Sequence, residues 1–110
     1  MWLCTQIGFF SIVRKEPDTF HIRARCREDL DQLAQVAGTG TPIASYEGSD
    51  YPWRILCPAA DLPRFMSALS ASIAYGNFKS AIAASATQRP KLSAYHDIHH
   101  RMVEWQQKQA

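Results

Sequence analysis

The first part of the chain carries a strongly apolar segment followed by a strictly alternating one. In residues 2–14 (WLCTQIGFFSIVR) both alternating sides are apolar, which predicts one central strand covered on both faces, with a bulge at Gly8. The polar residues 15–18 (KEPD) predict a turn. In residues 19–27 (TFHIRARCR) apolar and polar positions alternate, which predicts a strand with one buried face and one cationic face exposed to water.

The period then changes from that of a strand to that of a helix. Apolar residues recur at helical spacing through residues 28–37, so we expect a helix there. Glu28 and Asp29 lie where a helix N-terminus favours negative charge, and Gly38 is a typical C-terminal stop.

The second half of the chain predicts two more strands and three more helices. Residues 43–47 (IASYE) and 51–57 (YPWRILC) have the composition of short strands separated by a GSD turn. The remaining apolar stripes have helical spacing, and we expect helices over residues 58–76, 78–85 and 91–108. Asn77 and Asp61 are suited to cap helices at their N-termini.

These elements define the fold class. The order β-β-α-β-β-α, followed by two further helices, predicts an α+β fold with a four-stranded, mainly antiparallel sheet and helices on its apolar face. The chain has 110 residues, 46% apolar and 20% charged, and a net charge of +2, which favours one globular domain over 1–110. The same composition excludes a disordered or low-complexity chain.

The N-terminal segment gives no sign of export. It lacks the positive region and the cleavage site of a signal peptide, and no stretch is apolar enough for a membrane-spanning helix. Cys4, Cys26 and Cys57 form no CxxC pair, and their odd number favours reduced thiols. We therefore expect a cytoplasmic protein without a membrane partner.

Five short patterns resemble those of a group of small bacterial and phage-related proteins of unknown function. They are WLxTxxGFFS (2–11), RxRxxxDLxxL (23–33), DYPxR (50–54), YxNFK (75–79) and YHD (95–97). The resemblance implies a small cytosolic protein of bacterial or phage origin. It carries no known activity and therefore assigns no catalytic residue.

The alternating strand provides the first candidate site, a row of basic side chains. Neighbours in the row are two residues apart, about 6.6 Å along a strand, and one more basic residue extends it from a neighbouring strand. Arginine can bind a carboxylate or a phosphate through two parallel hydrogen bonds. A solvated face balanced by acids such as Glu47 and Asp18 is the alternative. The candidate binding residues are His21, Arg23, Arg25, Arg27 and Arg54.

The last predicted helix provides a second candidate site. His96 and His100 are four residues apart and share a helix face, where they could chelate zinc with Glu104 one turn further on. The spacing is similar to the HExxH pattern of zinc proteases, with Asp in place of Glu. The alternative is a surface pair of histidines, with Asp97 and Arg101 forming an ordinary ion pair.

The apolar first segment suggests a further contact surface. If helices cover only one side of the sheet, part of Trp2, Phe10 and Ile12 stays exposed, and such a patch usually marks a partner or homodimer surface. Helices after residue 77 could instead cover it.

We therefore expect a non-catalytic protein-binding module that acts through the arginine-bearing strand face and needs no cofactor. By analogy alone, such a small protein would regulate or inhibit a larger assembly, for example a CRISPR-type host defence complex. Two alternatives stay open. One is a metal-dependent hydrolase using His96 and His100 with zinc, and the other is a nucleic-acid-binding protein using the arginine row.

Overall fold

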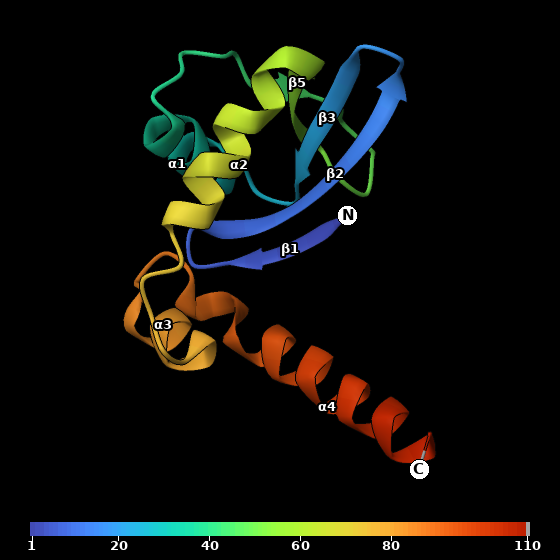
Figure 1. Cartoon of the computed structure of the whole chain (residues 1–110), viewed down its shortest axis with the longest axis vertical. Coiled ribbons are helices and arrows are strands. Elements are labelled where there is room, and N and C mark those ends of the chain that lie inside the picture. The colour runs from blue at the N-terminus through green and yellow to red at the C-terminus, as the bar shows by residue number, and fades with distance from the viewer. Residues whose placement is uncertain (110) are drawn as a thin grey trace. The chain divides into compact units, whose positions relative to one another are not determined.

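The computed structural model describes residues 1–109, which form five strands and four α-helices (Figure 1). Short 3₁₀ turns at Ala59–Asp61 and Arg89–Lys91 precede the second and the last α-helix. In chain order the elements are β1 (Trp2–Thr5), β2 (Gly8–Glu16), β3 (Thr19–Ala24), α1 (Arg27–Ala37), β4 (Ala44–Ser45), β5 (Trp53–Pro58), α2 (Leu62–Ala71), α3 (Phe78–Ala84) and α4 (Leu92–Lys108).

The chain divides into two compact units, Met1–Ala74 and Tyr75–Ala110. The first unit holds all five strands in one antiparallel sheet with the order β1-β2-β3-β5-β4. The predicted α+β class and antiparallel pairing are therefore confirmed. The predicted number of four strands is wrong, because the apolar segment at the start contributes two.

A tight turn splits that apolar segment. The Thr5 hydroxyl oxygen accepts hydrogen bonds from the backbone N–H groups of Ile7 (3.3 Å) and Gly8 (3.1 Å), and the hydroxyl donates to the carbonyl of Gly8 (2.7 Å). These bonds satisfy the backbone where the chain reverses from β1 into β2. Because Ile7 at the turn is itself buried in the core, the pattern of apolar residues gives no sign of the reversal.

The hairpin changes which side chains face the core. Leu3 pairs with Phe10 and Trp2 pairs with Ser11, so these two rows lie on opposite faces of the sheet. Phe10 and Ile12 are therefore buried, so they do not form the exposed patch that was one of the two alternatives for this segment. Trp2 alone of that expected patch is exposed, by 73%.

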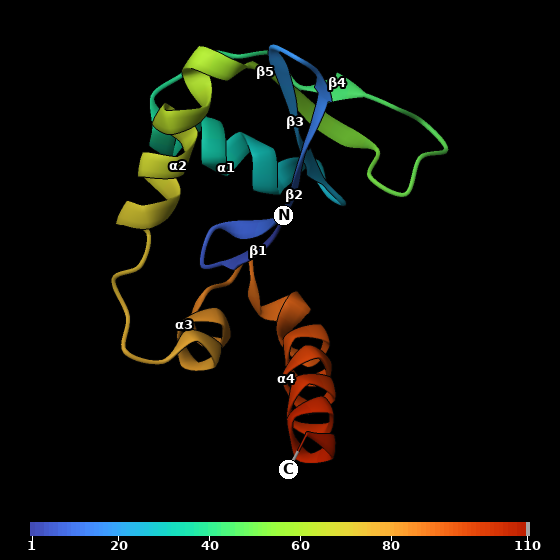
Figure 2. The same ribbon diagram turned by 45° about the vertical axis from the view of Figure 1, so that its right-hand side comes forward.

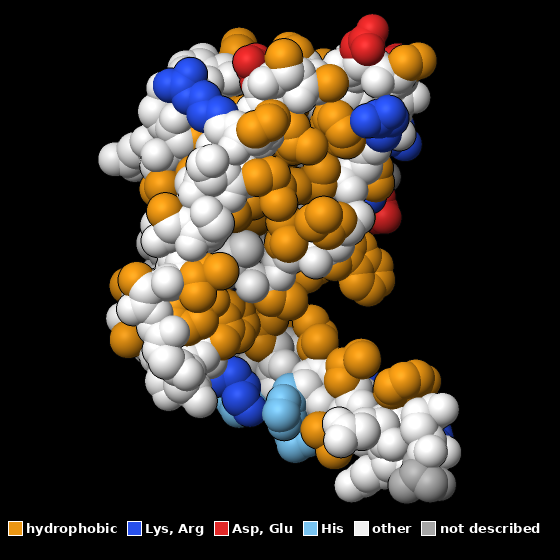
Figure 3. Space-filling model, viewed as in Figure 1, with side chains coloured by type: hydrophobic (Ala, Val, Ile, Leu, Met, Phe, Trp, Pro, Cys, Tyr) orange, Lys and Arg blue, Asp and Glu red, His pale blue; other side chains and the backbone are white. Residues whose placement is uncertain are grey.

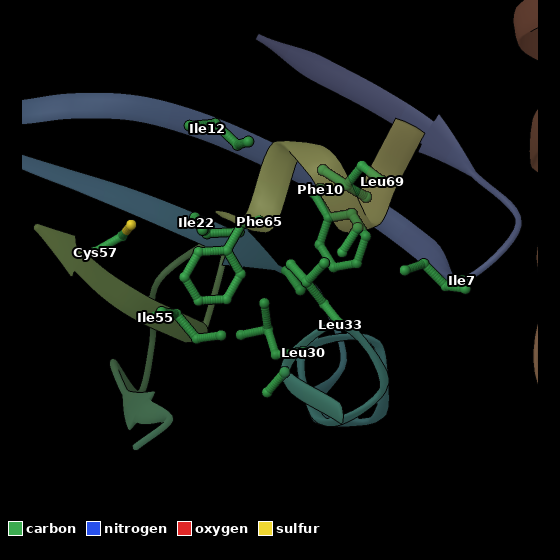
Figure 4. Packing of buried hydrophobic residues seen from close by; sticks show 13 residues of the cluster. Ile7, Phe10, Ile12, Ile22, Leu30, Leu33, Ile55, Cys57, Phe65 and Leu69 are labelled. Atoms are coloured by element: carbon green, nitrogen blue, oxygen red, sulfur yellow. The ribbon is translucent and has the colours of Figure 1, made fainter. Parts of the chain in front are cut away.

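One face of the sheet carries the core. Both α1 and α2 pack on this side, which we call the inner face (Figure 2). Side chains from β2, β3 and β5 point toward those from the two helices (Figure 4), and Phe10, Ile22, Leu30, Leu33 and Ile55 are completely buried.

Helix α1 is fixed to the sheet at its first turn. The buried carboxylate of Asp29 accepts a hydrogen bond from the backbone N–H of Phe9 (3.1 Å). The approach is so close that a Cβ atom on Gly8 would lie 2.7 Å from the Asp29 side chain. The helix ends, as predicted, at Gly38, whose φ of 68° is in the left-handed region that glycine tolerates.

Helix α2 is shorter than the sequence predicts. It begins at Leu62, with Pro63 in its first turn, and ends at Ala71 rather than at residue 76. Asp61 precedes it but forms no side-chain cap. The Arg64 guanidinium of α2 donates to the carbonyl oxygens of Ala37 and Gly38, and so provides positive charge at the C-terminus of α1.

The second unit is a pair of helices with a small buried centre. The Asn77 side chain caps α3 as predicted, accepting a hydrogen bond from the backbone N–H of Ser80 (2.9 Å). Phe78 packs edge-to-face on Tyr95 of α4, with ring centroids 5.0 Å apart. The predicted helix over residues 91–108 is confirmed as α4, but three members of its apolar stripe are exposed: Ile98 by 45%, Met102 by 58% and Trp105 by 58%.

Candidate binding site on the outer face of the sheet

The face of the sheet opposite α1 and α2, which we call the outer face, carries the arginines. The strand register places Trp2, Ser11, Arg23 and Arg54 in one row across β1, β2, β3 and β5. The segment between β4 and β5 lies on this side (Figure 2) and contributes polar and aromatic groups to it.

The predicted row of basic residues is interrupted where β3 ends. Strand β3 stops at Ala24, so His21 and Arg23 lie on the strand, Arg25 follows it, and Arg27 is the first residue of α1. Arg27 lies over the Trp53 ring, 5.6 Å from its centroid, and its guanidinium is 3.7 Å from Asp31. The alternation predicted the faces of β3 correctly but extended the strand too far.

Two of the arginines contact the same aromatic ring. The guanidinium carbons of Arg23 and Arg25 lie 4.5 Å and 4.2 Å from the centroid of Tyr51, within the range of cation–π attraction. Arg23 also donates to the hydroxyl of Ser11 (2.6 Å), and Arg25 donates to the backbone carbonyl of Asp50 (2.9 Å). Tyr51 is buried, whereas Arg25 remains exposed.

Arg54 is the centre of a buried polar network. It donates to the Tyr51 carbonyl (3.3 Å), to the Ser49 hydroxyl (3.0 Å) and to Nδ1 of His21 (3.2 Å). Its guanidinium carbon lies 4.5 Å from the centroid of the Tyr46 ring. Arg54 and His21 are only 9% and 8% exposed, so the expectation that both project into water is wrong. The segment between β4 and β5 is the physical reason, because Arg54 donates hydrogen bonds to Ser49 and Tyr51 and the His21 ring lies 6.1 Å from the Tyr46 ring.

Burial and the neighbouring Arg54 both favour the neutral form of the His21 imidazole. Burial lowers the pKa of the His21 imidazole below its ordinary value of 6.5, and the positive charge of Arg54 lowers it further. Among the other neighbours, Glu16 raises this pKa, whereas Lys15 and Arg23 lower it. A neutral imidazole accepts the hydrogen bond from Arg54, as the geometry requires.

The positive charge of this cluster is not balanced locally. Within residues 1–109, no carboxylate forms a salt bridge with Arg23, Arg25 or Arg54. The expected balance by Glu47 or Asp18 is therefore not found, and tyrosine rings and neutral oxygens hold the guanidinium groups instead.

Three of the short sequence patterns come together in this cluster. Ser11 belongs to WLxTxxGFFS, Arg23 and Arg25 to RxRxxxDLxxL, and Tyr51 and Arg54 to DYPxR. Sequence reasoning missed Ser11, Ser49 and the two tyrosines, Tyr46 and Tyr51. The sequence shows Tyr51 two residues before Trp53, but no local pattern indicates that the Tyr51 ring contacts Arg23 of β3.

The predicted zinc ligands on α4 do not assemble into a metal site. The rings of His96 and His100 are stacked with centroids 6.5 Å apart, and Glu104 forms an ion pair with Arg101 at 3.3 Å. The expected Asp97–Arg101 partnership is thus replaced by one with Glu104. In the part of the chain that the structure describes, no three His, Cys, Asp or Glu side chains are grouped to hold a metal ion.

The surroundings of these histidines are open. Histidine side chains gather on α4 beside exposed hydrophobic ones (Figure 3), and a hollow of about 380 Å³ is lined by Asp97, His100, Arg101 and Glu104.

The cysteines form no disulfide bond with one another. All three are free thiols, and Cys57 is buried, which raises the pKa of its thiol, with Asp61 adding to the effect.

Comparisons of the chain with protein-family models, with curated proteins and with solved structures give no match. The resemblance to small bacterial and phage-related proteins therefore stays a prediction. In residues 1–109, no helix combines the length and apolarity needed to cross a bilayer.

Proposed function

We propose that the chain is a non-catalytic protein-binding module whose contact surface is the outer face of the sheet. The observation that supports this most is the 73% exposure of Trp2 on the same face as Arg23. Leu56, two residues beyond Arg54 on β5, is 41% exposed. Tryptophan and arginine contribute more binding energy at protein interfaces than most other residues do.

The contacts that orient Arg25 support the same proposal. Trp2 and Leu56 lie on strands, and the guanidinium of Arg25 rests on Tyr51 and is hydrogen-bonded to the Asp50 carbonyl. Side chains that are ordered before binding lose little conformational entropy on contact with a partner. As part of the proposal, the partner belongs to a larger assembly that this module regulates or inhibits.

Nucleic acid is a weaker candidate for this face. The net charge of the chain is only +2, and Arg54 is buried in internal contacts. Few arginines then remain for phosphates, whose neutralisation supplies most of the affinity in such complexes. The hydrolase alternative loses support because Glu104 is engaged by Arg101.

Matched variants test the proposal. Tagged wild-type protein, Trp2→Ala and the control Trp105→Ala, which is also an exposed tryptophan, are each used to capture partners from cells that encode the chain. We expect one protein to bind the wild type and Trp105→Ala and to be lost with Trp2→Ala. Calorimetry with that purified partner should repeat the order. Equal binding by all three variants would contradict the proposed surface.

A further inference from the structure

Three arginines lie close together on the outer face, and no carboxylate among residues 1–109 forms a salt bridge with them. Arg23 and Arg25 both lie within 4.5 Å of the Tyr51 ring centroid, and Arg54 is opposite Arg23 on the neighbouring strand. Like charges at such short separation repel each other unless solvent or an anion offsets the repulsion. A negatively charged group bound here would gain from all three charges.

Arg25 is the member of the cluster that a ligand can reach. A guanidinium has five N–H donors. The hydrogen bonds of Arg25 within residues 1–109 use the Nη1 atom, which donates to the carbonyl of Asp50. Because Arg25 is exposed, its other donors can form the paired hydrogen bonds that a carboxylate accepts.

The carboxylate of Asp50 is not hydrogen-bonded to Arg25. Arg25 contacts Asp50 through the backbone carbonyl, whereas the Asp50 carboxylate accepts a hydrogen bond from the Ser49 hydroxyl (3.3 Å). Tyr51 and the Asp50 carbonyl thus orient the guanidinium of Arg25 and leave its charge available.

Resting on the proposed function, we infer that the partner presents an acidic peptide segment. One carboxylate of this segment binds to Arg25, and the positive charges of Arg23 and Arg54 add to the attraction. The charge of the cluster is complementary to such a segment. The apolar neighbours Trp2 and Leu56 on the same face suit the remainder of a peptide better than a sugar–phosphate chain.

The probe is a short blocked peptide in which glutamate alternates with threonine, compared with its glutamine counterpart. Both are titrated into the full chain while the arginine Nε–H signals are followed by NMR. We expect a saturable shift at Arg25 with the glutamate peptide and none with the glutamine peptide. The affinity should fall as salt is added, since exposed charges are screened.

Variants at position 25 separate charge from hydrogen-bond geometry. Arg25→Gln should weaken binding of the glutamate peptide by roughly tenfold, the size expected for a charge-assisted hydrogen bond. Arg25→Lys keeps the charge without the planar pair of donors and should give an intermediate affinity. Arg101→Gln, at an 83% exposed arginine side chain on α4, should have no effect. Unchanged thermal melting would establish that the variants fold.

Three outcomes overturn the inference: no shift at Arg25, equal shifts at Arg25 and Arg101, or tighter binding of a single-stranded DNA oligonucleotide that Arg25→Gln abolishes. Binding of the captured partner to Trp2→Ala and to Arg25→Gln distinguishes this inference from the proposed function. If Trp2→Ala loses that partner and Arg25→Gln retains it at full affinity, the interface stands and the acidic segment does not.

Discussion

The two units of the chain are ordered by different kinds of interaction. Met1–Ala74 buries an apolar core between the sheet and two helices, and residues distant in the chain are joined by hydrogen bonds such as Phe9 to Asp29. In the second unit, the described residues that are buried are Ile82, Gln88 and Tyr95. Much of its order is local: the Asn77 cap, the bond from Arg89 to the Ala83 carbonyl and the bond from Lys91 to Gln88.

This difference indicates which of the two units contributes more to stability. A segment shorter than about 40 residues rarely buries enough surface to be stable by itself. We therefore expect the first unit, which also carries the outer face, to provide most of the free energy of folding. Substitutions in the two units should accordingly differ in size, and the following predictions run from the largest expected effect to the smallest.

Phe10→Ala should produce the largest loss. Phe10 is completely buried between the sheet and the helices. Removing a buried phenylalanine costs about 3–5 kcal/mol, because apolar contacts are lost and a cavity remains. Urea denaturation followed by circular dichroism measures the free energy of unfolding. Trp105→Ala in the second unit should change it by less than about 0.5 kcal/mol, and a comparable loss in both variants would invalidate the contrast between the units.

Arg54→Met should have the next largest effect. The substitution keeps most of the side-chain volume but leaves the Tyr51 carbonyl, Ser49 and His21 without their donor. Leaving buried polar groups unsatisfied costs about 1–3 kcal/mol. Denaturation measures this loss, and Arg101→Met on α4 is the matched control. A stability equal to that of the wild type would show that the network on the outer face contributes nothing to folding.

Asn77→Ala tests the local order of the second unit. Losing the cap of α3 should cost about 1 kcal/mol. Because the cap lies in the second unit, hydrogen exchange should accelerate at the Ser80 amide and stay unchanged in the sheet. Asn77→Asp keeps the accepting oxygen and should preserve the wild-type rate. Faster exchange across both units would mean that they unfold together.

The smallest expected effect is a dependence of stability on pH. The pKa of His21 is lowered in the folded chain, so between its folded value and 6.5 the unfolded chain binds more protons. The free energy of unfolding should therefore fall as the pH drops below about 6.5, and the loss should stop below the folded pKa. His21→Asn retains an acceptor for Arg54 and should remove this contribution. If His21→Asn keeps the wild-type pH profile, a group other than His21 causes the dependence of stability on pH.

Local signals in the sequence predicted the elements that local interactions define. The alternation around Ile22, the acidic first turn and glycine stop of α1, and the Asn77 cap each depend on neighbours a few residues apart. The hairpin at Ile7 was missed because its turn residue is apolar and its polar support comes from one threonine hydroxyl.

The candidate site was predicted in part for a related reason. The side of β3 that carries Arg23 follows from the alternation, but the burial of Arg54 depends on a segment that returns over the sheet through Ser49 and Tyr51. No pattern within that segment specifies which strand it will cover. The contacts of Tyr46 and Tyr51 with the arginines therefore follow only from the three-dimensional structure.

The contact between Asp29 and the amide of Phe9 couples two elements that would otherwise open independently. Opening of the hairpin at Phe9 breaks a bond to a carboxylate that belongs to α1, so the opening also removes a contact that holds the first turn of the helix. The exposed Trp2 thus lies on a hairpin that α1 holds in place. In the proposed complex, a force applied through Trp2 would act on the bond between Phe9 and Asp29 as well as on the strand pairing of the hairpin.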